Sequence, residues 1–322
     1  MKMLARPLAR LFLPVAFIFV TGSAHAAPRT WVSGAGTDTG NCTRGAPCKS
    51  FWYAITKTDA GGELSVIDSA DYVSSGQVVA IDKSISIVAE GAEGGLTFGQ
   101  SQVSIGLWLN GSPGTIINLR GLTLDGLRSG NSGILVGSGI SVNIENCVVK
   151  NWFIQGLYVV PDSAAKIAVS NTTFINNGVS NQGGAIIVNP TTGGTAQVAL
   201  ERVLISNNVF GIAADGSGST GGINMTIADS VMTGNTNDGV VATSSAGHAP
   251  SGVAVVNSKL LNNGFGTRSL GNNVTVRLDG SKVIGNGTGV SASSGGALLS
   301  AGNNIVEANA TNGAFTGPIT LK

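Results

Sequence analysis

The sequence predicts an all-β solenoid in which every coil contributes three short strands, and composition, repeats and turn spacing together predict it. The chain has 322 residues, of which 42% are hydrophobic, 11% charged and 5% aromatic, and 48 are glycine. Helical bundles need alanine, leucine and charged residues at helical spacing, and this pattern is missing. Lysine and arginine total 18 against 17 acidic residues. This balance excludes the basic surface that nucleic-acid binding requires.

Six segments repeat one pattern of alternating apolar residues, a polar or glycine turn, a second short apolar run and usually an asparagine. They begin at Val142, Ile167, Val198, Met225, Val253 and Val276. In most copies a third short apolar run follows and opens with glycine. Repeats of this length with period-two alternation are typical of a parallel β-helix, whose strands stack from coil to coil. We expect about nine coils over residues 69–322.

Two columns of turn residues recur when the segments are aligned. The first column contains Asn146, Asn171, Arg202, Asp229, Asn257 and Gly280. The second contains Trp152, Asn177, Asn208, Asn235, Asn263 and Asn286, at steps of 25, 31, 27, 28 and 23 residues. Asparagine tolerates a left-handed backbone, and its amide can pass hydrogen bonds along a stack. We therefore predict that the five asparagines of the second column form a structural ladder with no catalytic role.

The first 26 residues have the pattern of a secretory signal peptide. Lys2, Arg6 and Arg10 precede an apolar stretch from residue 11 to 20, and the segment Ala24–Ala26 offers a small-residue cleavage site. Ten apolar residues are too few for a membrane-spanning helix. The sequence therefore predicts cleavage near Ala26 and a secreted or periplasmic protein with no membrane span in the mature chain.

Residues 27–68 are predicted to form an N-terminal cap. Ser50 can cap a short helix that buries Phe51, Ala54 and Ile55 and ends at Gly61-Gly62. Such a helix would cover the open strand edge at this end of the solenoid. In the same segment Cys42 and Cys48 are expected to form a disulfide, because export leads to an oxidising compartment. A metal site is the alternative, although no nearby histidine or cysteine completes a ligand set.

The cap resembles the opening of many bacterial right-handed β-helix proteins of the pectate-lyase-like superfamily. The matching positions are Trp31-Val32-Ser33, Gly36-Thr37-Asp38, Thr43 to Pro47, and Phe51 to Ile55. With the asparagine-turn repeats, this resemblance covers essentially the whole mature chain. It implies a single-stranded right-handed parallel β-helix. The superfamily includes lyases, hydrolases, epimerases, tailspikes and adhesins, and the chain looks most like its exported members of unknown function.

The sequence offers few candidates for catalysis. Glycoside hydrolysis needs two carboxyl groups across the scissile bond, and calcium-dependent lyases need clustered acids, whereas no two acidic residues are adjacent here. If the protein is an enzyme, the candidate residues are Asp125, Asp162, Asp215, Arg268 and His248. The meeting of two or more of them within about 6 Å in one groove would favour catalysis. No cofactor is expected. The loop of residues 36–41 offers oxygen ligands for Ca²⁺ but lacks the glutamate and the spacing of an EF-hand loop.

Trp152 and Tyr158 form the most distinctive aromatic pair of the repeats. Exposed aromatic rings can pack against sugar rings, so this pair is a candidate ligand-binding surface, with core filling as the other interpretation. We therefore predict an exported, non-catalytic scaffold that binds a polysaccharide or a cell-surface or matrix partner along its face. The alternative prediction is a polysaccharide lyase or glycoside hydrolase acting on an acidic polysaccharide such as pectin. No nucleic-acid partner is expected.

Overall fold

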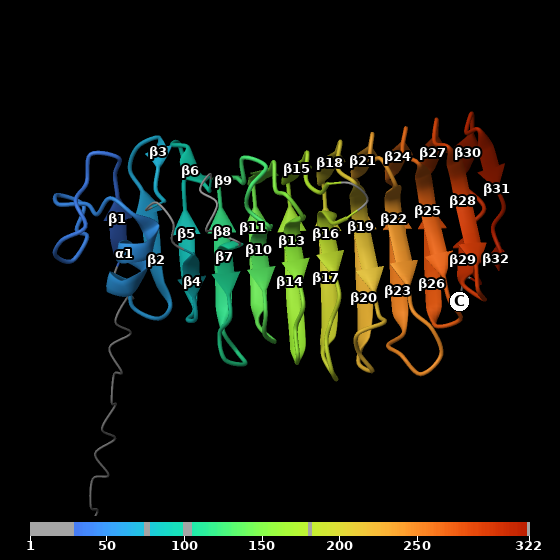
Figure 1. Cartoon of the computed structure of the whole chain (residues 1–322), viewed down its shortest axis with the longest axis horizontal. Helices are drawn as coiled ribbons and strands as arrows, with labels where there is room; N and C mark the ends of the chain where they lie inside the picture. Colours follow the sequence, from blue (N-terminus) through green and yellow to red (C-terminus); the bar gives the residue numbers. More distant parts are fainter. Residues whose placement is uncertain (1–28, 74–77, 99–104, 180–181, 321–322) are drawn as a thin grey trace, which may run out of the picture.

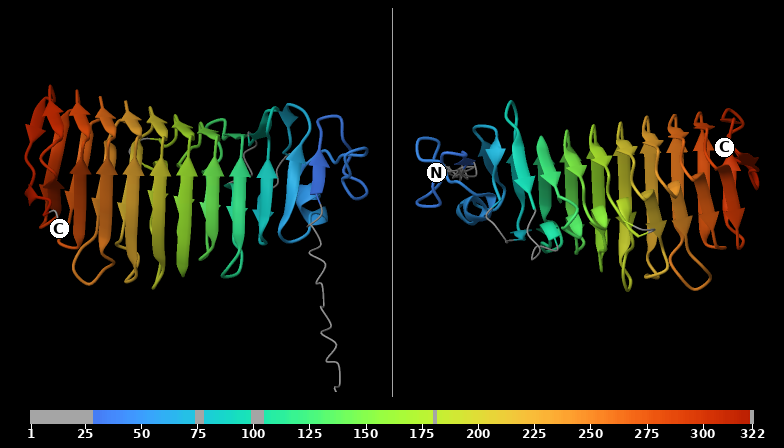
Figure 2. Two further views of the ribbon diagram at one scale, coloured as in Figure 1. Left: turned by 180° about the vertical axis from the view of Figure 1, so that it is seen from behind. Right: turned by 45° about the horizontal axis from the view of Figure 1, so that its top comes forward.

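The chain winds into a long parallel β-solenoid whose coils follow one another from the N-terminal to the C-terminal end (Figure 1). The computed structural model describes residues 29–73, 78–98, 105–179 and 182–320. The predicted signal peptide therefore lies outside the described residues. Among those described, no helix is long and apolar enough to cross a membrane. The view from behind and the view tilted by 45° show the same regular stack (Figure 2).

Three parallel sheets form the sides of the solenoid, and their strands are listed here in spatial order. The first sheet contains β1 (Arg29–Val32), β2 (Gly62–Val66), β5 (Ile85–Val88), β8 (Ile116–Arg120), β11 (Ser141–Glu145), β14 (Ala164–Ser170), β17 (Thr195–Glu201), β20 (Gly222–Ala228), β23 (Ser251–Val256), β26 (Val274–Asp279), β29 (Ala297–Ser300) and β32 (Gly317–Pro318). The second contains β3 (Ala70–Asp71), β6 (Gly94–Thr97), β9 (Leu122–Asp125), β12 (Val148–Lys150), β15 (Thr173–Ile175), β18 (Leu204–Ser206), β21 (Val231–Thr233), β24 (Lys259–Leu261), β27 (Lys282–Ile284) and β30 (Ile305–Glu307). The third contains β4 (Val79–Ile81), β7 (Ile105–Leu109), β10 (Ser132–Val136), β13 (Gln155–Val159), β16 (Gly184–Val188), β19 (Phe210–Asp215), β22 (Asp238–Thr243), β25 (Phe265–Leu270), β28 (Thr288–Ser293) and β31 (Thr311–Gly313).

Alternation of apolar and polar residues explains the strands. In β14 the side chains at 165, 167 and 169 are buried while those between them face outward. The parallel register places Ile167 beside Val198, and Val198 beside Met225, so each inward residue stacks on its equivalent in the next coil. These stacks form one continuous core along the axis. The predicted parallel β-helix with its repeated coils is confirmed.

The corner between the first and second sheets uses the first turn column. Its members adopt positive φ angles, from 47° at Asn257 to 58° at Gly280. The residue that follows the first column adds a second set of hydrogen bonds between coils, because in several coils its backbone N–H donates to a hydroxyl of the next coil. The N–H of Ser230 donates to Ser258 Oγ at 3.1 Å, and that of Ser258 to Ser281 Oγ at 3.2 Å. The first column therefore provides the left-handed turn residue of these coils.

The second turn column is the predicted asparagine ladder. In each step the Oδ1 of one asparagine accepts hydrogen bonds from the backbone N–H and the Nδ2 of the preceding one. Oδ1 of Asn235 lies 3.1 Å from both donors of Asn208, and Oδ1 of Asn263 lies 3.0 and 2.8 Å from those of Asn235. The ladder continues beyond the predicted members to Asn309 and Asn312. Its five predicted members are all buried.

Helix α1 (Phe51–Lys57) lies at the N-terminal end, where the sequence predicted a cap. Ser50 caps it by accepting from the N–H of Tyr53, and Phe51 is among the residues it buries. The helix ends earlier than predicted, because Thr58 leaves the helical conformation and Gly62 already begins β2. The expected end at Gly61-Gly62 is therefore wrong.

All three cysteines have defined roles in the structure. Cys42 and Cys48 form the predicted disulfide within the cap. Cys147 is buried, and burial raises the pKa of its thiol to about 11. The thiolate, which is the nucleophilic form, is therefore disfavoured at neutral pH. Cys147 acts as a small core residue, in agreement with its apolar sequence context.

A carboxyl network around Asp68 joins the cap to the solenoid. Asp68 accepts hydrogen bonds from Ser33 Oγ at 2.6 Å, Tyr72 Oη at 2.5 Å and the N–H of Gly34 at 2.8 Å. These donors, led by Ser33, hold the pKa of Asp68 below its ordinary value of 3.8. A lowered pKa stabilises the fold above pH 3.8, and this contribution is lost as the pH falls through the folded-state pKa.

We therefore expect Asp68→Asn to lower the melting temperature at pH 6 and to have less effect as the pH falls below the ordinary carboxyl value. Thermal unfolding of both proteins over a pH series measures this. Asp59→Asn, at an exposed carboxyl close by, is the control and should leave the melting temperature almost unchanged. A constant difference between wild type and Asp68→Asn at every pH would contradict the assignment.

Candidate functional site

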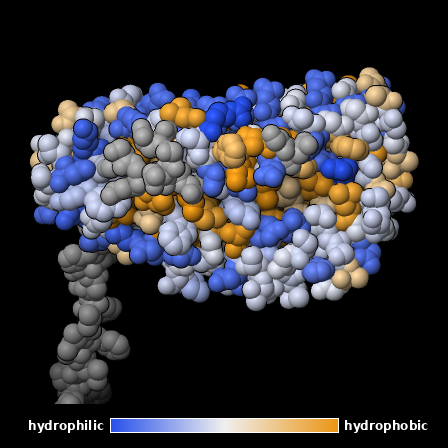
Figure 3. Space-filling view, in the orientation of Figure 1, coloured by the Kyte–Doolittle hydropathy of each residue, from blue (hydrophilic) through white to orange (hydrophobic). Residues whose placement is uncertain are grey.

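The outer face of the third sheet carries a row of mainly apolar side chains, which we call the outer row. Cross-strand pairing aligns one outward residue from each successive coil. The outer row consists of Ala80, Trp108, Leu135, Tyr158, Ile187, Ala213, Val241 and Arg268. Adjacent strands are about 4.8 Å apart, so the row forms a nearly continuous surface strip parallel to the axis of the solenoid. Hydrophobic side chains gather along the middle of the face shown in Figure 3.

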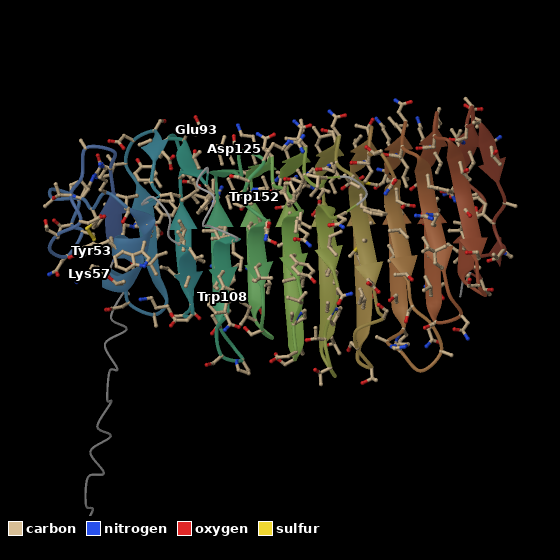
Figure 4. The ribbon with its side chains drawn as sticks, in the orientation of Figure 1. Tyr53, Lys57, Glu93, Trp108, Asp125 and Trp152 are labelled. Atoms are coloured by element: carbon tan, nitrogen blue, oxygen red, sulfur yellow. A yellow bond between two sulfur atoms is a disulfide. The ribbon has the colours of Figure 1, made fainter. Side chains whose placement is uncertain are left out.

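A groove of about 420 Å³ lies over the central part of the outer row. Its floor contains Tyr158, Ile187 and Ala213, with Arg268 at one end. One edge carries Gln155 and Phe210, and the other carries Asn189, Asp215 and Leu270. A second hollow of about 330 Å³ lies nearer the cap and is lined by Trp108, Asp82 and Asn110. Trp108 is 41% exposed, and Figure 4 labels it on β7.

Arg268 is held in place by a buried carboxylate and an aromatic ring. Its Nε and Nη2 donate to the two carboxylate oxygens of Asp238, each at 2.5 Å. Its guanidinium carbon lies 4.3 Å from the ring centre of Phe265. Asp238 is completely buried, and this burial raises the pKa of its carboxyl although Arg268 opposes the shift. This bidentate ion pair fixes the guanidinium at the end of the groove, and Asp238 neutralises much of its positive charge.

Asp215 forms the polar edge of the groove together with Asn189. Nδ2 of Asn189 donates to Asp215 Oδ2 at 2.7 Å, while Ser217 donates to Oδ1 through its N–H at 2.9 Å and its hydroxyl at 2.6 Å. Tyr158 lies nearby, and the pKa of its phenol is raised by burial and by the negative charge of Asp215. At neutral pH Tyr158 therefore carries its proton and can donate a hydrogen bond into the groove.

The five candidate catalytic residues do not assemble into one site. Asp215 and Arg268 line the same groove. Asp125 lies on the second sheet, where it accepts from Asn151 Nδ2 at 3.0 Å and pairs with Lys150 at 3.4 Å. Figure 4 shows it at the edge of the solenoid, away from Trp108.

The other two candidates lie in loops. Asp162 lies between β13 and β14 and accepts from Ser163 Oγ at 3.0 Å. His248 is exposed between β22 and β23, where its carbonyl accepts from Asn273 Nδ2 at 2.9 Å. Neither residue lines the groove of the third sheet.

The structure places Trp152 in the core, which supports the interpretation as core filling. Its side chain is completely buried, with its ring centre 5.4 Å from that of Phe98. Trp152 occupies an asparagine position at a buried corner of the coil, where its backbone N–H still donates to Asn177 Oδ1 at 3.1 Å. Of the predicted aromatic pair, only Tyr158 reaches the groove.

The oxygen-rich loop of residues 36–41 has one carboxylate, that of Asp38, and it already accepts hydrogen bonds from the start of α1. Asp38 accepts from the N–H groups of Lys49 and Ser50 at 2.8 and 2.9 Å, and from Ser50 Oγ at 2.8 Å. It therefore orients the start of α1. Within the part of the chain that the structure describes, no group of three or more acidic, histidine or cysteine residues could hold a metal ion.

Sequence reasoning missed two important residues of this face. Trp108 lies upstream of the six clearest repeats, in a coil whose pattern is weak. Asp238 precedes its partner Arg268 by 30 residues, so that only the coil register reveals the pair. An outward position occupied by apolar residues in successive copies, such as Tyr158, Ile187 and Ala213, is the signal that could have identified the outer row.

Comparisons with known proteins identify the fold. No protein-family model and no curated protein sequence matches the chain. Among solved structures, pectate lyase Pel9A aligns with a TM-score of 0.57 and 16% identity over 92% of this chain and 79% of its own. A rhamnogalacturonan lyase gives 0.45 and 12% over 84% and 72%. The ORF18 protein of Geobacillus virus E2 gives 0.48 and 14%, and the match covers 80% of this chain but 55% of that one. The chain is thus a right-handed parallel β-helix that shares its fold with pectate lyase Pel9A.

Proposed function

We propose that this protein binds a polysaccharide chain lengthwise along the outer row of the third sheet. The observation that carries this proposal is the alignment of Trp108, Leu135, Tyr158 and Ile187 in successive coils. Flat apolar side chains pack against the faces of sugar rings, while polar groups at the edges donate to and accept from hydroxyls. Here Asn189 and the other polar residues of the groove edges supply those groups.

We further propose that the bound chain is not cleaved. A hydrolase needs one carboxyl group to protonate the leaving oxygen and another to activate water. In the groove, both carboxylate oxygens of Asp238 accept from Arg268, and Asp215 already accepts three hydrogen bonds. Both carboxylates therefore have structural partners, which favours a role in positioning and binding.

Replacing Tyr158 with alanine is expected to weaken polysaccharide binding about tenfold, because its ring forms the floor of the groove. Affinity electrophoresis against a panel of soluble polysaccharides, followed by calorimetry with the best ligand, measures this. Trp52→Ala is the matched control, because Trp52 is an aromatic residue of α1 that is 44% exposed. Equal affinities of wild type and Tyr158→Ala for every ligand would contradict the proposal.

A second candidate function is a polysaccharide lyase or glycoside hydrolase. The observation that favours it is the presence of Asp215 and Arg268 in one groove. Incubation with acidic and neutral polysaccharides, with and without Ca²⁺, should then produce unsaturated products or new reducing ends. Activity that Arg268→Ala abolishes would establish this candidate and would overturn the non-catalytic proposal.

We also propose that the protein is exported after cleavage near Ala26. The disulfide between Cys42 and Cys48 supports this, because disulfides persist in oxidising compartments. Expression of the full chain in a bacterial host, followed by N-terminal sequencing of the protein recovered outside the cytoplasm, tests it. An N-terminus at Ala27 is expected, whereas an uncleaved cytoplasmic chain would contradict export.

A further inference from the structure

The hollows beside the outer row carry acidic side chains that no cation compensates among the described residues. Arg268 is the one cationic residue lining the groove among the described residues, and its guanidinium is engaged by Asp238. This pair is neutral as a unit, so Asp215 leaves the groove with one uncompensated negative charge. No described cation lies within ion-pair distance of Asp215.

The second hollow beside the outer row is also negatively charged. Asp82 lines it beside Trp108. The neighbouring Lys83 does not compensate this charge at the row, because its Nζ donates to the carbonyls of Ile55 and Thr58 in the cap, at 2.8 and 2.5 Å. Both hollows along the row therefore combine apolar floors with an acidic side chain.

We infer that the outer row selects polysaccharides of uncharged sugars and rejects those rich in uronic acids; this inference rests on the proposed function. A uronate carboxylate on the row would meet the charges of Asp82 and Asp215, and no described residue offers it a free cation. Unpaired like charges brought together at a binding surface disfavour association. A neutral sugar has no such penalty, and its apolar face can lie on Tyr158 and Ile187.

The test compares neutral and acidic ligands on the intact mature protein. Affinity electrophoresis uses xylan, galactomannan and a soluble β-glucan against polygalacturonate and alginate, with EDTA to remove bridging calcium. Neutral ligands should retard the protein, and acidic ligands should not at low salt. Raising the salt from about 0.01 M to about 0.15 M shortens the Debye length from about 30 Å to about 8 Å. Weak binding of acidic ligands should therefore increase with salt, while neutral binding stays constant.

A gain-of-function variant tests the cause of this selectivity. Ala213→Lys adds a cation to the floor of the groove beside Asp215, and Ala199→Lys adds the same charge on β17 of the first sheet, where Ala199 is exposed. Ala213→Lys should improve binding of polygalacturonate roughly fivefold, the effect of one unit charge a few ångströms away across water. Ala199→Lys should leave it unchanged.

Each outcome bears on a defined claim. Binding of polygalacturonate at low salt as tight as that of any neutral ligand would overturn the inference and leave the proposed function in place. Equal gains from Ala213→Lys and Ala199→Lys would assign selectivity to the overall charge, and would overturn the role of the outer row. Binding to none of the five polysaccharides would overturn the proposed function itself, and the inference with it.

Discussion

Replacing Trp152 with alanine is expected to lower the free energy of unfolding by about 3–5 kcal/mol, the cost of removing a large aromatic side chain from a packed core. Trp152 is completely buried, and its ring packs against that of Phe98 at a tilt of 47°. Chemical denaturation of the mature protein measures the change. Trp52→Ala should change the stability by less than about 0.5 kcal/mol, because Trp52 is largely exposed. A loss below about 1 kcal/mol at Trp152 would contradict its role as a core anchor.

Glycines around Trp152 provide an independent check of this packing. A Cβ added at Gly130 would lie 2.4 Å from the indole ring, and one at Gly133 would lie 2.8 Å from its Nε1. Gly130→Ala should therefore destabilise the wild-type protein but have much less effect when Trp152 is already alanine. A double-mutant cycle measures this coupling. Additive effects of the two substitutions would show that the side chains do not compete for the same space.

Replacing Asn235 with alanine is expected to cost about 2–4 kcal/mol, because several buried polar groups lose their partners at once. Oδ1 of Asn235 accepts from two donors of Asn208, and its Nδ2 donates to Asn263 Oδ1 and to the carbonyl of Ile205. An unpaired buried donor or acceptor loses its hydration without compensation. Equilibrium denaturation in urea measures the change.

Asn224→Ala is the control for the ladder, since Asn224 is exposed on β20. It should leave the stability within about 0.5 kcal/mol of wild type. Asn235→Asp separates the two halves of the interaction, because its carboxylate can still accept from Asn208 but cannot donate to Asn263. We expect it to be destabilising as well. A neutral effect of both changes at 235 would contradict the structural importance of the ladder.

The solenoid could be predicted from the sequence because its strands and turns are specified by residues close together in the chain. Period-two alternation specifies which side of each strand is buried, and a left-handed turn residue is visible as Asn171 or Asn257 at a fixed offset. The ladder was predicted for the same reason. Its extension to Asn309 and Asn312 was missed because the final coil lacks the apolar pattern that marks the other copies.

The site was predicted less completely because it depends on which residues of different coils become neighbours. Coil lengths vary, so Asp238 and Arg268 meet only through the register of β22 with β25. Trp152 shows the opposite difficulty, since its place in an asparagine column did not reveal whether the ring points inward. The structure shows that it points inward, and it identifies Trp108 as the exposed tryptophan of the third sheet.

The central claim, that the outer row of the third sheet holds a polysaccharide, is tested most directly by hydroxyl-radical footprinting with and without a neutral polysaccharide. Oxidation of Trp108 and Tyr158 should fall when the ligand is present, because both side chains lie on the outer row. Oxidation of the exposed Trp52 should not change. Unchanged oxidation of Trp108 and Tyr158 at saturating ligand would contradict the claim.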